Sequence, residues 1–410
     1  MRKNGVDKTL TPIEGGVCAP EGFLASGVCC GVSKAHFAFE DKNQPDFALI
    51  TGVKHKRYPV AGVFASGAFE SVNTELTKRH IRYEYAQGVM ITSGIANTFG
   101  EVARENALRL CKAVERASGL AKDELVVCST GLLGKPFPVA DFEGKAAVLC
   151  EGLGESAAHS TLAARAIMTT DKYPKELAFS FYIGDISCKI GAIFKGSTQV
   201  NPNLSTTICV LTTNVNITAK MLHKALSSAV NDTLNMSAID ASSSPNDMAV
   251  ILSSCTAGNY KISQDDSEYK KFYYALQQTL VAVCERLVRS GTESEKLCIT
   301  KVLGAKSKKT ARTVAKTVSA MLTARKTCLS AGICVQDLLG ALQNVQESLS
   351  VDKLQVILQS ANGAFVLYEE GATIPQTQEI VQGILNTDTV EIEIRLNEGN
   401  YSATAYGCLD

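Results

Sequence analysis

The chain has 410 residues, of which 45% are hydrophobic, so it can form one large or two ordinary domains around a sizeable core. Its 41 Lys and Arg balance 41 Asp and Glu, and a formal charge of zero argues against a nucleic-acid groove or an anionic membrane surface as its partner. No apolar run approaches the roughly 20 residues of a membrane span, and the N-terminus lacks the apolar core of a secretory signal. We therefore expect a soluble, cytoplasmic protein.

Strand-like and helix-like segments alternate along the chain. Apolar runs rich in β-branched residues predict strands at 47–53, 88–92, 125–128, 178–183, 206–211, 248–253 and 297–302. Helical spacing of apolar residues predicts helices at 100–117, 157–168, 219–230, 269–289 and 311–328. Three short segments are typical of hairpin turns: Gly184-Asp185, Asn362-Gly363 and Glu398-Gly399-Asn400. The pattern indicates a mixed α/β chain with antiparallel sheet and long helices.

The cysteines and histidines do not form a metal-binding pattern. Fourteen cysteines are scattered along the chain without a C-x-x-C pair, and the five histidines are isolated. Most of the cysteines lie inside apolar stretches, where a reduced thiol behaves as a small hydrophobic side chain. We expect buried thiols in a reducing compartment and no metal site.

The segment from Lys195 to the apolar run 208–211 carries a possible catalytic pattern. Lys195-Gly196-Ser197 leads through Pro202-Asn203-Leu204-Ser205 to Thr206, a hydroxyl residue between a loop and a strand. Such a hydroxyl can attack the carbonyl before it, and hydrolysis then leaves a free α-amine, with a pKa of roughly 8, as general base beside the nucleophile. The same residues also fit an ordinary turn before a strand. Thr207 is a competing hydroxyl, although strand alternation turns it to the other face.

This segment resembles the processing site of the ornithine acetyltransferase family, the glutamate N-acetyltransferases of arginine biosynthesis, which reads K-G-S-G-M-I-x-P-N-M-A-T-M-L. The spacing from Lys195 to Thr206 matches without a gap. Further family motifs occur in the same order: Gly15-Gly16-Val17, Ala61-Gly62-Val63-Phe64, Ser129-Thr130-Gly131, Ala166-Ile167-Met168-Thr169-Thr170-Asp171 with Pro174-Lys175, and Asn246-Asp247. The resemblance covers nearly the whole chain.

The resemblance implies a fold and a division of the chain. The fold is an α/β, layered αββα-type sandwich with a smaller C-terminal α/β lobe. Residues 1–205 would form an α piece that contains half of the sandwich, and residues 206–305 would begin a β piece that completes it. Residues 306–410 would form the lobe, with the basic stretch 306–310 as the expected boundary. By family analogy the two pieces stay associated and pair as an α2β2 heterotetramer.

The resemblance also implies roles for individual residues. Thr206 would be the nucleophile, released by cleavage after Ser205, and Thr130 with Gly131 would form the oxyanion hole. The implied substrate contacts are Thr169, Lys195, Thr206 and, by a shift of one position, Glu293. On residue type alone, Thr130-Gly131 also fits an ordinary turn and Lys195 a solvated surface charge.

The implied reaction is a ping-pong transfer of acetyl from N2-acetylornithine to glutamate through acetyl-Thr206. It needs neither metal nor organic cofactor, and acetyl-CoA would serve only as an alternative acetyl donor. The expected partners are therefore an N-acyl amino acid and an amino-acid acceptor.

Three departures from the family pattern concern substrate recognition. Thr292 occupies the position of a substrate-binding Glu, with Glu293 next to it, and 240–247 has lost a carboxylate and a glycine of the family motif. The chain ends at Asp410, where the family continues into a tail that closes over the substrate. Three alternatives therefore stay open: another acyl donor or acceptor, an amidohydrolase or aminopeptidase that passes the acyl group to water, and a non-catalytic homologue.

Overall fold

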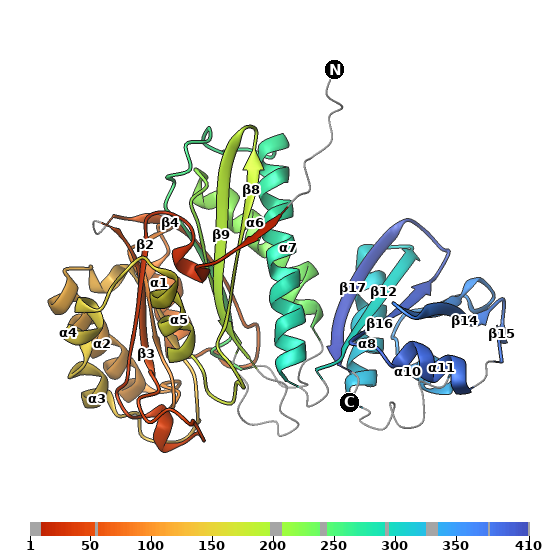
Figure 1. The fold of residues 1–410 in the computed structure, drawn as a ribbon, viewed down its shortest axis with the longest axis horizontal. Coiled ribbons are helices and arrows are strands. Elements are labelled where there is room, and N and C mark those ends of the chain that lie inside the picture. Colours follow the sequence, from red (N-terminus) through yellow and green to blue (C-terminus); the bar gives the residue numbers. More distant parts are fainter. Residues whose placement is uncertain are drawn as a thin grey trace. The chain divides into compact units, whose positions relative to one another are not determined.

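The computed structural model describes residues 10–53, 56–196, 207–237, 244–291, 295–324, 335–375 and 378–408. The chain forms two compact units: the first contains most of the residues up to Thr279, and the second contains most of the residues from Leu280 onward (Figure 1). None of the helices in these described ranges is long and apolar enough to cross a membrane.

The first unit contains a four-stranded sheet that is buried on both faces. Phe47 and Leu49 belong to one core and Ile50 to another, because successive side chains of a strand point to opposite faces. A parallel pair lies at one edge of the sheet, and α2 (Glu101–Ser118) connects its two strands. The strands, in spatial order, are β2 (Phe23–Val28), β3 (Phe47–Gly52), β6 (Gly88–Thr92) and β7 (Leu125–Ser129).

A seven-stranded sheet forms the second layer of this unit. Its central strands include the hairpin β8–β9, whose turn contains Gly184 at φ 63°, a left-handed conformation that favours glycine. β10 pairs in antiparallel with β9 and in parallel with β11. The strands, in spatial order, are β1 (Thr11–Ile13), β8 (Lys175–Ile183), β9 (Ile186–Lys195), β10 (Ile208–Thr213), β11 (Met248–Ser253), β4 (Tyr58–Phe64) and β5 (Tyr85–Ala86).

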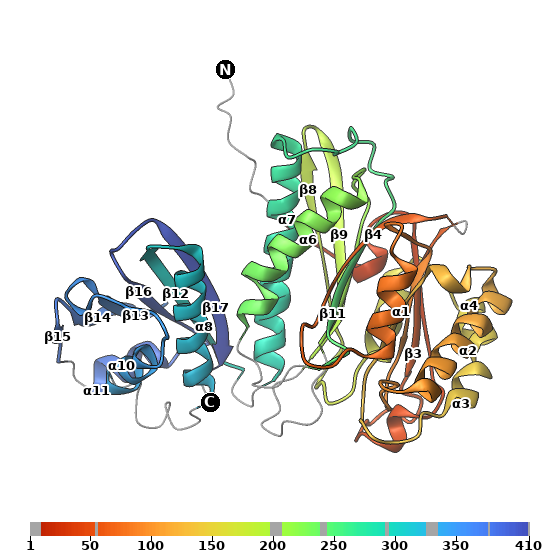
Figure 2. The ribbon, with the colours of Figure 1, turned by 180° about the vertical axis from the view of Figure 1, so that it is seen from behind.

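The two sheets pack face to face, and helices cover their outer faces. Residues from both sheets share one buried core, which also takes in α5 (Ala157–Ala166); it includes Ile50, Ile91, Val126, Ala163, Val210 and Val250. The outer face of the four-stranded sheet packs against α1 (Val72–His80), α2, α3 (Val139–Glu143) and α4 (Ala146–Glu151). α6 (Ala219–Asp232) and the first half of α7 (Ser267–Ser290) lie along the seven-stranded sheet (Figure 2). The layering confirms the expected αββα-type fold.

The second unit is a smaller α/β lobe, as expected. A six-stranded sheet packs one face against α8 (Lys308–Ala324), α10 (Val335–Gln343) and α11 (Gln378–Leu385). The other face packs against the part of α7 that contains Cys284 and Val288. The strands, in spatial order, are β15 (Ala372–Thr373), β14 (Gly363–Glu369), β13 (Gln355–Ser360), β16 (Thr389–Arg395), β12 (Leu297–Ala305) and β17 (Tyr401–Cys408).

Two expectations about this unit need correction. The boundary expected at 306–310 comes too late, because β12 pairs with β16 and β17 and is a central strand of the lobe. The hairpin expected at 398–400 does not form, because β12 lies between β16 and β17. The connection instead passes over the end of β12, where the Glu398 backbone nitrogen donates to the Gly304 carbonyl at 2.7 Å. The turns at Gly184-Asp185 and Asn362-Gly363 do join antiparallel partners.

Candidate active site

Lys195 is the last residue of β9 and lies opposite Ile208 of β10. Its side chain is directed into the protein, and only 1% of the residue is exposed. The Lys195 Nζ donates to Thr169 Oγ1 at 2.8 Å and to Thr130 Oγ1 at 3.2 Å. The alternative of a solvated surface charge is therefore wrong. One ammonium joins residues from both sheets and from the loop that follows α5.

Thr130 and Gly131 follow the end of β7, and their backbone lies close to the loop after β6. The Thr130 backbone nitrogen donates to the Thr92 carbonyl at 2.9 Å, and Leu132 donates to the Gly94 carbonyl at 3.0 Å. Gly131 has φ 125°, and a Cβ at this position would lie 2.3 Å from the carbonyl carbon of Gly94. Only glycine fits here, for conformational and steric reasons together.

Several hydrogen-bond donors at this site remain available. A charged lysine has three N–H donors and no acceptor, so Thr130 and Thr169 must accept from Lys195 and keep their own hydroxyl hydrogens. Within the described residues, neither hydroxyl has a hydrogen-bond acceptor, the third N–H of Lys195 has none, and the buried Gly131 N–H also has none. These four donors are available to anionic oxygens of a ligand.

Asp171 lies behind this cluster and joins three segments of chain. Its Oδ1 accepts from Lys175 Nζ at 2.5 Å and from the Gly196 backbone nitrogen at 3.1 Å, and its Oδ2 accepts from the Thr169 backbone nitrogen at 3.1 Å. The side chains of Asp171 and Lys175 are each only 1% exposed. Burial alone would raise the pKa of Asp171, but Lys195 and Lys175 outweigh it and lower that pKa to about 2.

The pKa of Lys195 is lowered from its ordinary value. The main cause is burial, which disfavours the charged ammonium, and Lys175 acts in the same direction as a neighbouring cation. Asp171 and Asp247 oppose this shift by stabilising the charged form. The protonation of Lys195 therefore depends on a balance among three charged neighbours.

Asp247 holds the start of β10. Its Oδ1 accepts from the Thr207 backbone nitrogen at 2.6 Å, and its Oδ2 accepts from the Ser244 backbone nitrogen at 2.9 Å. The neighbouring Asn246 is fully buried, and its side chain donates to Thr98 Oγ1 at 3.1 Å. The end of the altered motif at 240–247 thus anchors the first described residue after the predicted cleavage position.

The sequence-predicted site residues fall into two groups. The structure brings together Thr130, Gly131, Thr169 and Lys195, whereas Ser205, Thr206 and Glu293 lie outside the described residues. Sequence analysis quoted Asp171 and Lys175 as members of a family motif but did not predict that they form a buried pair. The sequence pattern that could have indicated this pair is an Asp and a Lys four residues apart inside the family motif that contains Thr169.

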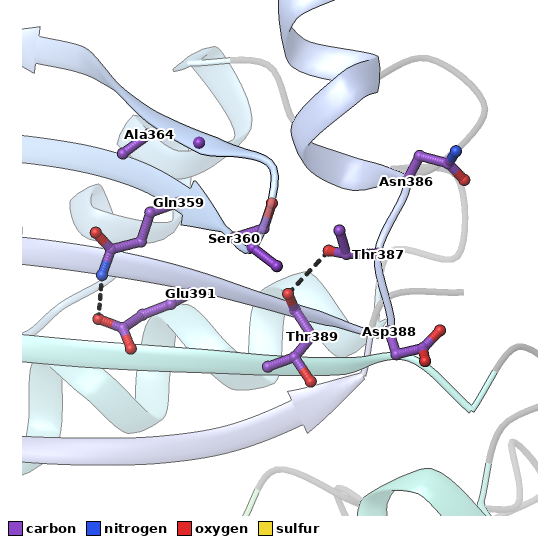
Figure 3. Close-up of a pocket in the computed structure, with 10 residues that line it drawn as sticks. Gln359, Ser360, Ala364, Asn386, Thr387, Asp388, Thr389 and Glu391 are labelled. Atoms are coloured by element: carbon purple, nitrogen blue, oxygen red, sulfur yellow. Dashed lines mark hydrogen bonds between the residues drawn. The ribbon is translucent and has the colours of Figure 1, made fainter.

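A cavity of about 850 Å³ lies at the edge of the second unit's sheet, and none of the predicted site residues is among those that line it. Two hydrogen bonds join residues that line it (Figure 3): Gln359 Nε2 donates to Glu391 Oε1 at 2.5 Å, and Thr387 Oγ1 donates to the Thr389 carbonyl at 2.9 Å. Lys301 also donates to Glu391, at 3.0 Å. Because none of the predicted site residues lines this cavity, the cluster around Lys195 is the stronger candidate site. Across the described parts of the chain, no three His, Cys, Asp or Glu side chains gather so as to hold a metal ion.

Comparisons with known proteins agree over almost the whole chain. The profile of the ArgJ family matches residues 26–409. A glutamate N-acetyltransferase from Methanopyrus kandleri is 31% identical over 391 residues, which cover 95% of this chain and 96% of the relative. The arginine biosynthesis bifunctional protein ArgJ 1 from Clostridium acetobutylicum is 29% identical over 387 residues, which cover 94% of this chain and 92% of the relative.

Among solved structures, the ornithine acetyltransferase of Mycobacterium tuberculosis, complexed with ornithine, gives a TM-score of 0.41 at 24% identity, over 48% of this chain and 100% of that chain. The relatives of known sequence are named for acetyl transfer and for arginine biosynthesis. Because the family profile and the relatives each span nearly the full length, the chain belongs to the ArgJ family, a family of acyltransferases.

Proposed function

We propose that this protein is a self-cleaving acetyltransferase of arginine biosynthesis that moves acetyl from N2-acetylornithine to glutamate. Membership of the ArgJ family and the names of its relatives support the reaction class. The observation that carries the proposal is the Lys195 ammonium, buried and bonded to both Thr130 and Thr169, with available donors around it.

Self-cleavage comes first in this proposal. The Thr206 hydroxyl attacks the Ser205 carbonyl carbon, the C–N bond breaks, and an ester forms. Water then hydrolyses the ester, which leaves the Ser205 carboxylate and a free Thr206 α-amine. The Thr207 amide, held by Asp247 at 2.6 Å, fixes the chain immediately after this position.

Transfer then proceeds in two steps through an ester. The Thr206 hydroxyl attacks the acetyl carbonyl of N2-acetylornithine, its proton passes by way of the α-amine to the departing amine, and ornithine leaves. The α-amine of glutamate attacks the acetyl ester, the C–O bond breaks, and the proton returns to Thr206. The acceptor of acetyl is an amine in this scheme, whereas a hydrolase would use water.

The donors assigned above divide between two tasks. The Thr130 hydroxyl and the Gly131 N–H stabilise the oxyanion that forms on the acetyl oxygen in each step. Lys195 and Thr169 bind the carboxylate that donor and acceptor both carry. Glu293 stays a predicted substrate contact.

Other expectations from the sequence complete the proposal. The reaction uses no metal or organic cofactor, and acetyl-CoA is at most an alternative acetyl donor. The two pieces remain associated, pair as α2β2 and work in the cytoplasm. Buried thiols such as Cys111 and Cys128 support a reducing compartment.

The test is intact-mass spectrometry of the wild type beside Thr206→Ala, followed by an assay with N2-acetylornithine and glutamate. We expect two wild-type fragments that meet at Ser205–Thr206, one uncleaved mutant chain, and the formation of N-acetylglutamate with ornithine. Free acetate without an amine product would favour the amidohydrolase alternative. A single uncleaved chain in both samples, without turnover, would favour a non-catalytic homologue.

A further inference from the structure

Within the described residues, the Asp171 carboxylate accepts three hydrogen bonds, and two of them come from backbone N–H groups of residues that border the site. It receives the Thr169 and Gly196 backbone N–H groups, each at 3.1 Å, and the Lys175 ammonium at 2.5 Å. Thr169 supplies a hydroxyl to the cluster, and Gly196 directly follows Lys195. One side chain thus fixes the two segments that carry a predicted substrate-binding hydroxyl and ammonium.

A purely structural role would not require charges at this place. Removing two charges from water is costly, and a well-packed apolar pair often stabilises a fold as well as a buried ion pair does. Asp171 and Lys175 are nevertheless both almost completely buried. Their charges have a local consequence, because they lie close enough to the Lys195 ammonium to influence its protonation in opposite directions.

The buried charges around Lys195 are not balanced, and their excess positive charge favours the binding of one more anion. Among the described residues around Lys195, the fully buried charged groups are two cations, Lys195 and Lys175, and one anion, Asp171. Asp247, which is partly buried, is the other acidic group that acts on Lys195. An incoming carboxylate would neutralise the excess positive charge of the buried groups, provided that Asp171 keeps Lys195 charged and in place.

We propose that Asp171, with Lys175 as its buried counter-ion, is the positioning residue that holds the Lys195 ammonium and the Thr169 hydroxyl in their working arrangement. This inference rests on the proposed function. Asp171 touches neither substrate nor the reacting atoms; it acts through the two residues that do.

The test compares Asp171→Asn, Lys175→Met and the double variant D171N/K175M with the wild type. Asp265→Asn is the matched control, because Asp265 forms an exposed pair with Lys224 at 2.7 Å. Two quantities are measured: the pH profile of kcat/KM for acetyl transfer, and the pKa of Lys195 by NMR of lysine-labelled protein. The second quantity does not depend on turnover.

Asp171→Asn removes an anion that stabilises the charged form of Lys195, so the Lys195 pKa falls and the alkaline limb of the profile moves to lower pH. Lys175→Met removes a repelling cation, so the Lys195 pKa rises and the alkaline limb of the profile moves to higher pH. We expect Asp171→Asn to lower kcat/KM by roughly 10- to 100-fold, the range that applies to the partners of metal ligands, which also act by orienting another group. The double variant should recover part of this loss, and Asp265→Asn should match the wild type.

The proposal is overturned if Asp171→Asn, Lys175→Met and the wild type have the same Lys195 pKa and the same midpoint of the pH profile of kcat/KM. In that case only a structural role remains, whether or not activity is lost. If Asp171→Asn does not fold, Lys175→Met decides, since it keeps the carboxylate and its hydrogen bonds to the backbone. A wild type that gives no acetyl transfer would refute the proposed function instead. The opposite shifts of the Lys195 pKa would then still show that Asp171 and Lys175 act on Lys195.

Discussion

Lys195 and Thr130 come from different sheets, and the Lys195 Nζ donates to Thr130 Oγ1 at 3.2 Å across the end of the shared core. Lys195 ends β9 of the seven-stranded sheet, and Thr130 follows β7 of the four-stranded sheet. The packing of the two layers therefore sets the distance between the ammonium and the proposed oxyanion donor, Thr130. The same bond leaves the Thr130 hydroxyl hydrogen available for a substrate oxygen.

Replacing Thr130 tests the oxyanion assignment. Thr130→Val keeps the shape of the fully buried side chain but removes the hydroxyl, so we expect kcat to fall by roughly 10²- to 10³-fold. Thr130→Ser keeps the hydroxyl and should retain most of the activity. Steady-state kinetics with N2-acetylornithine and glutamate check both variants, and equal activity of Val and Ser would remove the hydroxyl from the mechanism.

Gly131 and Gly134 form a matched pair for substitution by alanine. Both have positive φ, but a Cβ on Gly131 would clash with the carbonyl carbon of Gly94 at 2.3 Å, whereas a Cβ on Gly134 meets nothing within 4 Å. We expect Gly131→Ala to lose acetyl transfer and to lower the free energy of unfolding by at least the roughly 1–3 kcal/mol of backbone strain. Gly134→Ala should show strain alone and keep its activity, as measured by urea unfolding and turnover.

Lys195→Ala tests the carboxylate contact. A site built around a buried charge discriminates strongly against a ligand that leaves the charge unpaired, so the wild type should prefer N2-acetylornithine over its carboxamide. We expect Lys195→Ala to lose at least roughly 10² in kcat/KM with the natural donor and to lose most of this preference. An unchanged kcat/KM would exclude the proposed role of Lys195.

The low pKa of Asp171 predicts how stability depends on pH. In the folded protein this pKa is about 2, below the ordinary value of roughly 3.9, so acid protonates the unfolded state first. Asp171 therefore contributes stability at pH values above its unfolded pKa, and the contribution is lost as pH falls toward 2. Urea unfolding at a series of pH values should show the difference between wild type and Asp171→Asn shrinking below pH 4. A difference that stays constant down to pH 3 would contradict the shift.

The fold was largely predictable because several of its strands are apolar and buried on both faces. Runs such as 47–53 and 248–253 gave clear signals, and the structure has strands at Phe47–Gly52 and Met248–Ser253. The pairing of β17 with β12 was not predictable in the same way. The sequence of a glycine-containing turn such as 398–400 has the same pattern in two cases: when the turn joins two neighbouring strands, and when it passes over a third strand that lies between them.

The residues of the candidate site could be proposed by motif, but their environment could not be predicted. Thr130, Thr169 and Lys195 were identified from the resemblance, and the structure brings them together. The burial of Lys195 was not evident, because a lysine before a Gly-Ser turn is normally solvated. The bonds of Asp171 depend on the meeting of its loop with the end of β9, residues 25 positions apart in sequence, which no local pattern encodes.

The central claim is that Thr206 carries the acetyl group between two amines. The most direct measurement is intact-mass and peptide spectrometry of the purified protein after mixing with N2-acetylornithine in the absence of glutamate. The account predicts one added acetyl group on the fragment that begins at Thr206, located on that residue and removed when glutamate is added. Transfer of acetyl to glutamate with no acetyl detectable on Thr206 under any quench condition, or with undiminished rate in Thr206→Ala, would contradict it.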